Sequence, residues 1–480
     1  MADKDFFLNI GTSRKAKNCV YPLVNGEETW ILIRDQLALA KKSIHLCFWV
    51  LESDLELIRE PKDTFKEPQK RNKYTLYYIL NTKAKDGVKV RILLWQIPVV
   101  PYSVYDFKTR ISGQIGHFEV MYQPHPTKTI GSWHQKTIII DDDIAFVGGM
   151  NAKENDWDTS AHKVYDYRRT RHNTSAGKRN KMKTNIDLPD FIPKHDYMTF
   201  IKGQIVTDVQ ANFVERWNYC ISQKYTYYQN ATKLAKPKLT SGFGNIPAQI
   251  TRTIPAYKPQ PAGERGIFYT YRKAIALAKN YIYIENQYFR SQLLAADIAR
   301  ACKKNRKLRV IVVTPPDYLN TLEQKDFWKV ATFSSYWTKQ ACHTIRSAMP
   351  EFCLFYLQMS ALDKKNKRKF FPIDLHAKIM IVDDEWYTIG SCNINDRGFL
   401  YDGEMNVSVQ HSSAKELRIK AFTQHLETQC PDKIEDAIKL WIDHAKKNHI
   451  AWKNKKKPVS RVYPFNQNGP LLPIIPSTWL

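Results

Sequence analysis

Two segments of the chain carry histidine and lysine at the same spacing. The first reads His134-Gln-Lys136 and the second reads His376-Ala-Lys378. In both segments an aspartate lies seven residues after the histidine and an asparagine lies seventeen residues after it; these residues are Asp141, Asn151, Asp383 and Asn393. Matched residues at unchanged spacing indicate an internal repeat that carries the same chemical groups in each copy.

The spacing within each unit favours phosphate chemistry. Residues two apart on a strand point the same way, so each histidine lies beside its lysine while the aspartate faces the other side. An imidazole can act as nucleophile or general acid, and an ammonium group can hold a phosphate oxygen. Two facing units would therefore form a symmetric site in which one histidine attacks phosphorus and the other protonates the leaving oxygen.

The alternative is that each histidine is a core residue and each lysine lies on a sheet edge, which the second matched copy disfavours. A metal site is also disfavoured, because a protonated lysine is not a ligand and no His-x-x-x-His spacing occurs. The sequence also lacks the glycine and lysine spacing of a phosphate-binding loop, which would indicate ATP use. We therefore expect neither a metal nor a cofactor.

The repeat extends to the elements that must position the motifs. The segment 38–46 resembles 276–284, and both are typical of a helix end that runs into a buried strand. Short apolar strands follow at 88–95 and 308–313. This alternation predicts two similar α/β units with mixed, mostly buried sheets, packed as an internal pseudo-dimer with the active site at their interface.

The composition suggests where the units meet. The stretch 221–263 contains no Asp or Glu and is rich in Pro, Gly, Lys and Tyr, as loops are. We expect a first catalytic unit over 1–225, a linker over 226–263, and a second unit over 264–480 with a C-terminal extension. The polar stretch 170–193 is expected to be an insertion in the first unit.

The net charge of +26 in 480 residues predicts a polyanionic partner or substrate. An anionic membrane, nucleic acid and a phosphorylated substrate all fit, as does a merely solubilising surface. One basic run comprises Lys364, Lys365, Lys367, Arg368 and Lys369. Neither a signal peptide nor an apolar run of about 18 residues is recognisable. We expect a monomer that is cytoplasmic or peripheral to a membrane, with export by a signal-less route left open.

The doubled motif resembles the signature of the phospholipase D superfamily. The segment Ile284-Glu-Asn-Gln-Tyr-Phe289 is similar to one in the lipid-cleaving branch, and so are the surroundings of His195 and of Gly403. The resemblance covers roughly residues 25–411. It implies a covalent phosphohistidine on His134, with His376 as general acid and then base.

The resemblance also implies roles for neighbouring residues. Lys136 and Lys378 would hold the non-bridging phosphate oxygens, assisted by a polar set of Asn151, Asn393 and Ser391. The first copy has Gly149 where the second has Ser391, so the halves need not contribute equally.

An acid from each half is expected to orient the histidines. The internal repeat favours Asp196 and Glu404, each at the head of a short strand-like run, with Asp166 as an alternative in the first half. Asp141 and Asp383 are interpreted as structural.

The function that this resemblance implies is that of a phospholipase D, which releases phosphatidic acid and a free head group, with head-group exchange as a second outcome. The substrate would be a phospholipid. A superfamily nuclease, a phosphatidyltransferase of the cardiolipin synthase type and a non-catalytic membrane scaffold are the alternatives. The intact histidines and lysines disfavour the scaffold.

Overall fold

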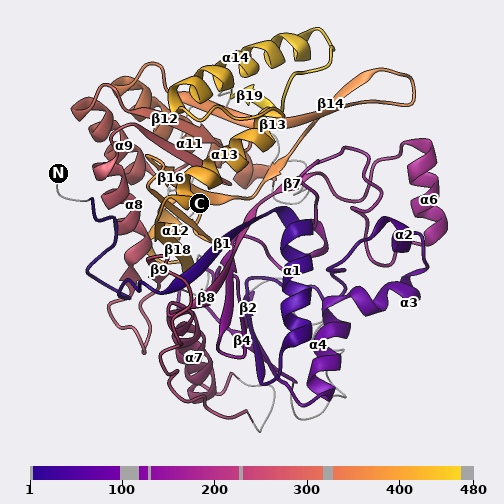
Figure 1. Cartoon of the computed structure of the whole chain (residues 1–480), viewed down its shortest axis with the longest axis vertical. Helices are drawn as coiled ribbons and strands as arrows, with labels where there is room; N and C mark the ends of the chain where they lie inside the picture. Colours follow the sequence, from indigo (N-terminus) through magenta and orange to yellow (C-terminus); the bar gives the residue numbers. More distant parts are fainter. Residues whose placement is uncertain (1–3, 98–117, 128–130, 226–230, 317–327, 466–480) are drawn as a thin grey trace.

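The computed structural model describes residues 4–97, 118–127, 131–225, 231–316 and 328–465, so the C-terminal tail lies outside the described part. Two large mixed sheets form the centre of the molecule (Figure 1). Across these ranges no helix is both long and apolar enough to span a bilayer.

The first sheet has the order β1-β8-β6-β5-β2-β3-β4. Its strands are β1 (Asn18–Val24), β2 (Ser43–Phe48), β3 (Lys89–Trp95), β4 (Phe118–Gln123), β5 (Thr137–Ile140), β6 (Ile144–Gly148) and β8 (Tyr197–Gly203). The second sheet contains the order β9-β18-β17-β16-β11-β12-β13. These strands are β9 (Ala248–Ile254), β11 (Tyr281–Asn286), β12 (Arg309–Val313), β13 (Cys353–Leu362), β16 (Lys378–Val382), β17 (Trp386–Gly390) and β18 (Glu404–Gln410).

The two orders match strand for strand, and so do their directions. The strand β2 runs parallel to β3 and antiparallel to β5, just as β11 runs parallel to β12 and antiparallel to β16. The second sheet is extended by β10 (Glu264–Arg265) and β14 (Arg368–Pro372) at its edges and by β19 (Val462–Pro464) on β13. The predicted α/β class with mixed, buried sheets is confirmed.

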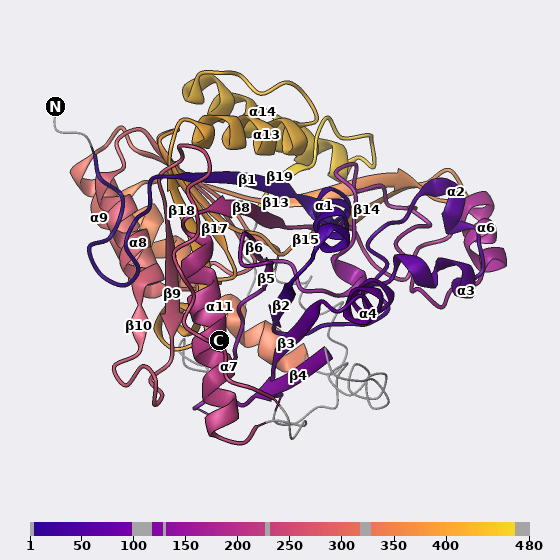
Figure 2. The same cartoon turned by 60° about the horizontal axis from the view of Figure 1, so that its bottom comes forward.

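Helices cover both sheets and fill the space around them (Figures 1 and 2). On one flank lie α1 (Asn25–Leu39) and α4 (Leu76–Lys85), and on the opposite flank lie α8 (Gly266–Leu277), α9 (Gln292–Lys304) and α11 (Trp328–Ala348). The helices α7 (Val206–Ser222), α13 (Ser413–Leu426) and α14 (Ile434–Lys453) contribute to an apolar core shared by the inner faces of both sheets. That shared core fixes the two halves against each other.

Strand alternation determines which core each residue joins. In β2 the side chain of Cys47 faces the shared core, whereas Leu46 and Phe48 face α1 and α4. In β11 the side chain of Tyr283 faces the shared core, whereas Ile284 packs against α8 and α9. Both faces of each central strand are therefore buried, as near-continuous apolar sequences predict.

Two expected boundaries can be compared with the contacts that the structure shows. The strand β9 lies within 226–263, so that segment is not only a linker but supplies a strand to the second sheet. The N-terminal segment also lies on the second half: Phe6 stacks on Trp386 at 5.8 Å, and Lys4 pairs with Asp383 at 2.8 Å. Neither contact is visible in local sequence patterns, because both join residues far apart in the chain.

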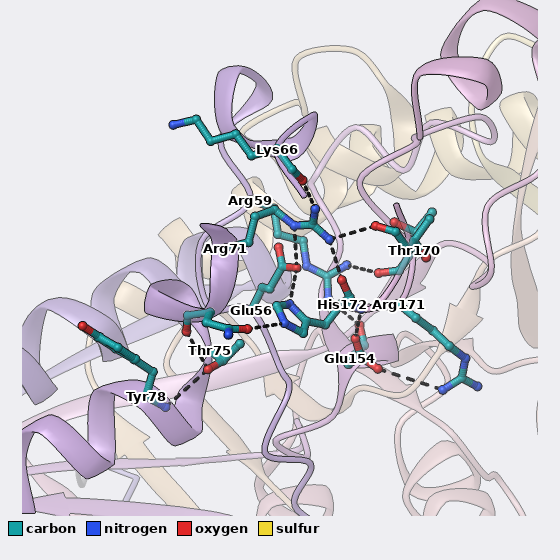
Figure 3. Close-up of polar contacts among 12 residues, drawn as sticks. Glu56, Arg59, Lys66, Arg71, Thr75, Tyr78, Glu154, Thr170, Arg171 and His172 are labelled. Carbon is teal, nitrogen blue, oxygen red and sulfur yellow. Dashed lines mark hydrogen bonds and ion pairs between the residues drawn. The ribbon is translucent and has the colours of Figure 1, made fainter. Parts of the chain in front are cut away.

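The polar insertion 170–193 carries α6 (Ala176–Asn185) beside the short helices α2 (Pro61–Thr64) and α3 (Pro68–Arg71). A buried charge cluster holds this region in place (Figure 3). The carboxylate of Glu56 lies 3.0 Å from Arg71 and 2.7 Å from His172, while Arg59 donates to the carbonyl of Thr170 at 3.1 Å. The insertion is thus tied to the first half by charged hydrogen bonds rather than by apolar packing.

Candidate active site

The two His-Lys segments meet where the halves of the chain touch. Residues 132–134 pair with 402–404: the His134 amide donates to the Gly403 carbonyl at 2.7 Å, and the Gly403 amide donates to Ser132 at 2.8 Å. A side chain at position 403 would not fit, because a Cβ there would lie 2.2 Å from the Trp133 ring. This backbone pairing brings His134 next to Glu404.

The second motif is held in the same way. The short strand β15 (Asp374–Leu375) pairs in parallel with β7 (Lys194–His195), and the His376 amide donates to the His195 carbonyl at 2.8 Å. This pairing brings His376 next to Asp196. Each motif is thus positioned by the segment that carries the acid of the opposite half.

Both acid–histidine contacts cross from one half to the other. The Nδ1 of His134 lies 2.9 Å from Oε1 of Glu404, and the Nδ1 of His376 lies 2.6 Å from Oδ2 of Asp196. Asp166, the alternative acid, instead pairs with Arg168 at 2.8 Å. The repeat therefore places one acid from each half on the histidine of the other half.

The two lysines are buried beside the histidines. Lys136 donates to the carbonyl of His134, and Lys378 donates to the carbonyl of His376 and to the side chain of Gln287 at 3.1 Å. The charge of Lys378 contributes to lowering the pKa of Lys136. Gln287 belongs to the segment 284–289, which resembles the lipid-cleaving branch. That resemblance could have identified Gln287 as a site residue.

The two halves differ beside the acids. The hydroxyl of Ser391 donates to Oε2 of Glu404 at 2.5 Å, so Ser391 contacts the acid that orients His134. A Cβ at Gly149 would lie 2.3 Å from Oδ1 of Asp196. The Asp196 carboxylate therefore lies in the space next to Gly149 that corresponds to the space of the Ser391 side chain in the second half.

The asparagines and aspartates of the motifs lie in different surroundings. The side-chain oxygens of Asn151 and Asn393 are buried and, within the described residues, accept no hydrogen bond. Asp141 accepts the amides of residues 41–43 at 2.6 to 2.9 Å, and Asp383 accepts those of residues 279–281 at 2.7 to 2.9 Å. The aspartates thus fix the chain at the start of β2 and of β11.

Aromatic side chains flank the first histidine. Trp49 meets the His134 ring edge-on at 6.0 Å between centroids and stacks on Trp95 at 5.8 Å. Trp49 follows β2 and Trp95 ends β3. The aromatic side chains beside His134 therefore come from the ends of two parallel strands. Neither tryptophan belongs to the repeated motif, so neither was predicted from the sequence.

Burial controls ionisation in the site. It raises the pKa of Asp196 and of Glu404 to about 8 and lowers the pKa of both imidazoles, because every charged form is desolvated. It also lowers the pKa of Lys136 to about 7 and that of Lys378 to about 8. Each acid–histidine pair is therefore net neutral near neutral pH, and a bound phosphate anion would favour the charged lysines.

A second buried cluster comprises His195, Glu285 and His425, whose geometry could hold a metal ion. Glu285 lies 3.0 Å from His195 and 3.2 Å from His425, and it also accepts the hydroxyls of Tyr197 and Tyr283 at 2.8 Å. The two hydroxyls and the two imidazoles can stabilise the Glu285 carboxylate without a metal ion. We interpret the cluster as a buried ion-pair network across the interface, in which the hydrogen bonds to Glu285 come from the two tyrosine hydroxyls.

Comparison with known proteins identifies the family. The profile described as "Cardiolipin synthase, PLD-like domain" matches residues 33–164 and 271–427, and the profile described as "Phospholipase D" matches residues 114–295. The two segments of the first profile cover more than half of the chain and correspond to its two halves. The chain belongs to the phospholipase D superfamily.

Named relatives agree with this assignment. Phospholipase D A of Dictyostelium discoideum is 28% identical over 397 residues, which is 75% of this chain but 30% of that protein. Phospholipase D zeta 2 of Arabidopsis thaliana is 25% identical, over 88% of this chain and 56% of that protein. The chain thus spans between about a third and just over half of the length of these relatives.

A solved structure shares the fold. The phosphatidylserine synthase of Haemophilus influenzae Rd KW20 superposes with a TM-score of 0.56 and 12% identity, covering 88% of this chain and 85% of that chain. At this identity the likeness concerns the fold alone.

The pKa values of the lysines predict how an anion binds. Sulfate keeps a constant charge near neutral pH, so its affinity should fall by about tenfold or more from about pH 6 to about pH 9 as Lys136 and Lys378 lose their protons. Ionisation of Asp196 and Glu404 near pH 8 acts in the same direction. Calorimetric titration of sulfate at several pH values measures the trend.

The control is the Lys136→Met/Lys378→Met variant, which should lose this pH-dependent component and keep only binding elsewhere on the basic surface. An affinity that is flat or rises with pH in the unsubstituted protein would contradict the proposed phosphate site.

Proposed function

We propose that the protein is a phospholipase D that hydrolyses the distal phosphodiester bond of a phospholipid through a phosphohistidine. The observation that carries the proposal is the pair of crossed acid–histidine contacts, 2.9 and 2.6 Å, with a buried lysine beside each histidine. Two imidazoles with occupied Nδ1 atoms leave two Nε2 atoms for chemistry. Such an arrangement suits displacement at phosphorus with one nucleophile and one proton donor.

The asymmetry of the halves favours His134 as the nucleophile. A hydrogen bond to an ionised carboxylate stabilises its charged form, so Ser391 favours ionised Glu404. When Glu404 is ionised, it accepts the Nδ1–H of His134 and leaves a lone pair on Nε2. Gly149 offers no such hydroxyl to Asp196, which accepts the backbone amide of Tyr197 at 2.7 Å instead, so the role of His376 as general acid rests on its place in the second motif of the family.

The proposed steps follow from these proton positions. The Nε2 of His134 forms a bond to phosphorus, the bond to the head-group oxygen breaks, and that oxygen takes the proton from Nε2 of His376. Water then attacks phosphorus, gives its proton to His376, and displaces His134 to release phosphatidic acid. An alcohol in place of water gives head-group exchange. Lys136 and Lys378 stabilise the charge on the non-bridging oxygens throughout.

Two alternatives have specific support. The profile described as "Cardiolipin synthase, PLD-like domain" favours transfer to an alcohol as a second candidate. The charge of +26 also suits a nuclease of the same superfamily. The relatives named phospholipase D favour the lipid hydrolase over both.

A substrate panel tests the proposal. Purified protein should release phosphatidic acid from one or more phospholipids, and His134→Ala and His376→Ala should each lose activity by about a thousandfold or more while melting normally. Single-stranded and double-stranded DNA are tested beside the lipids, with ethanol added in a parallel arm to detect exchange. DNA cleavage without phosphatidic acid release would reject the lipid assignment.

The assignment of the nucleophile predicts a trapped intermediate. An activated phosphodiester with a nitrophenol leaving group does not need a general acid, so His376→Ala should form the covalent adduct yet hydrolyse it slowly. Intact-mass and peptide mass spectrometry should locate the adduct on His134. The matched His134→Ala variant should show none, and an adduct on His376 in that variant would reverse the two roles.

The basic hairpin predicts membrane recruitment. The hairpin of β13 and β14 extends from the body next to α6 (Figure 1). Its turn and the first two residues of β14 carry the basic cluster of Lys364, Lys365, Lys367, Arg368 and Lys369. Because each lysine near an anionic surface contributes about 1 kcal/mol, replacing Lys365, Lys367 and Lys369 by Ala should weaken binding to phosphatidylserine vesicles by tenfold or more. Cleavage of a short-chain soluble lipid should change little.

The matched control replaces three exposed lysines of α14, namely Lys439, Lys446 and Lys447. Equal losses on vesicles and soluble lipid, or equal losses in the α14 variant, would show that the hairpin has no special part in membrane binding.

A further inference from the structure

Arg216 of α7 is a fully buried guanidinium whose partners are uncharged. Its Nε donates to Oε1 of Gln123 at 2.8 Å, and its Nη1 donates to Oε1 of Gln135 at 2.7 Å and to Sγ of Cys47 at 3.0 Å. Burial raises the pKa of the Cys47 thiol above its ordinary value, so this sulfur is a neutral acceptor and not a counter-ion. Among the described residues, Nη2 of Arg216 has no hydrogen-bond partner.

An unpaired buried charge is unfavourable for folding, because the group loses its hydration and gains no ion pair. Other arginines of the described ranges that are equally buried each lie within 3.5 Å of a carboxylate. They are Arg71 and Arg179 beside Glu56, Arg169 beside Asp158, and Arg418 beside Asp384. Arg216 departs from this pattern, which indicates a role other than stabilising the fold.

The guanidinium contacts the residues on both sides of His134. Gln135 accepts its hydrogen bond on one side, and on the other its central carbon lies 4.1 Å from the centroid of the Trp133 ring. This is the ring that leaves no room for a side chain at Gly403. Because these contacts are with the neighbours of His134, Arg216 can influence the imidazole only through them.

The amide of Gln135 extends the contact to the second half of the chain. Its Oε1 accepts from Arg216 and, at 2.8 Å, from Nδ2 of Asn212, while its Nε2 donates to the backbone carbonyl of Glu404 at 3.2 Å. Two donors at Oε1 determine which end of the amide is the oxygen, so Nε2 faces Glu404. We call this arrangement the Arg216–Gln135 clamp. It continues, by one residue, the backbone pairing that brings Glu404 next to His134.

The second motif lacks a clamp of this kind. Ala377 stands in place of Gln135, and Gln424 of α13 stands in place of Arg216 at the offset that also relates the two acids of the site. Ala377 has no side-chain donor, and the amide of Gln424 lies 3.0 Å from Nε2 of His162. The clamp therefore serves the first motif, which carries the proposed nucleophile.

From these contacts we infer that Arg216 is a positioning residue of the first motif. Its planar, permanently charged fork fixes the Gln135 amide, and that amide fixes the backbone of Glu404, so that this acid stays within hydrogen-bond distance of His134. The effect on turnover rests on the proposed function, whereas the effect on the acid–histidine contact does not.

The test applies nitrogen-15 NMR of labelled histidine to the full chain with Arg216→Met. Methionine fills much of the same space but donates no hydrogen bond, so the Gln135 amide is free to turn. The Nδ1–H resonance of His134 should shift, and that of His376 should stay in place. Gln135→Met removes the donor to Glu404 and should shift the same resonance.

The matched control is Arg418→Met, which removes an equally buried arginine from the corresponding helix of the other half. It breaks the 2.7 Å contact with Asp384, so its melting temperature should fall further than that of Arg216→Met. The His134 resonance should stay in place in this control. Site and stability effects are thereby separated.

Turnover of the activated nitrophenyl phosphodiester gives a second readout. Arg216→Met should lower kcat by about tenfold or more and change KM by less than about threefold, since a misplaced catalytic group slows the chemical step. Arg216→Met/Gln135→Met should lose little more than Arg216→Met alone, because both residues act through one amide.

An unchanged His134 resonance in Arg216→Met and Gln135→Met would overturn the inference, as would additive losses of kcat in the double variant. If Arg216→Met does not fold, Gln135→Met tests the same clamp with the arginine in place. The resonance requires no turnover. An unsubstituted protein without phosphodiesterase activity would therefore contradict the proposed function, and the resonance would still decide the positioning role.

Discussion

The arrangement of the site depends on hydrogen bonds that cross between the two halves of the chain. The acid at the head of β18 contacts the histidine of the first motif, and the acid at the head of β8 contacts the histidine of the second. Short backbone pairings beside each histidine, at Gly403 and at His195, hold these contacts in register. For neither motif does one half supply both the histidine and the acid that contacts it, so the proposed chemistry requires both halves in their packed arrangement.

The two halves keep the same strand order while differing at individual positions, and those differences are informative. The change from Gly149 to Ser391 alters which acid receives a hydroxyl hydrogen bond, and so distinguishes the two histidines. The change from Gln135 and Arg216 to Ala377 and Gln424 leaves the second motif without the side-chain clamp that the first motif has. An internal repeat thus acts as its own comparison, since the same backbone is seen with two sets of side chains.

Much of the fold was predictable because the signals are local. The repeated alternation of apolar strands and helices predicted two α/β units. The spacing of the two motifs indicated His134 and His376 as site residues. What could not be predicted depends on contacts between distant residues. The crossing of Glu404 to His134, the strand within 248–254, and the packing of Phe6 on Trp386 all arise from tertiary pairing. Local composition predicted a loop over 226–263, because a short strand such as β9 inside a polar segment has no strong sequence pattern of its own.

The crossing contacts are tested most directly by nitrogen-15 NMR of histidine-labelled protein. The Nδ1–H resonance of His134 should shift in Glu404→Gln and stay unchanged in Asp196→Asn, and the resonance of His376 should show the opposite response. Resonances that respond to the acid of their own half, or to neither acid, would contradict the crossed arrangement on which the proposed mechanism rests.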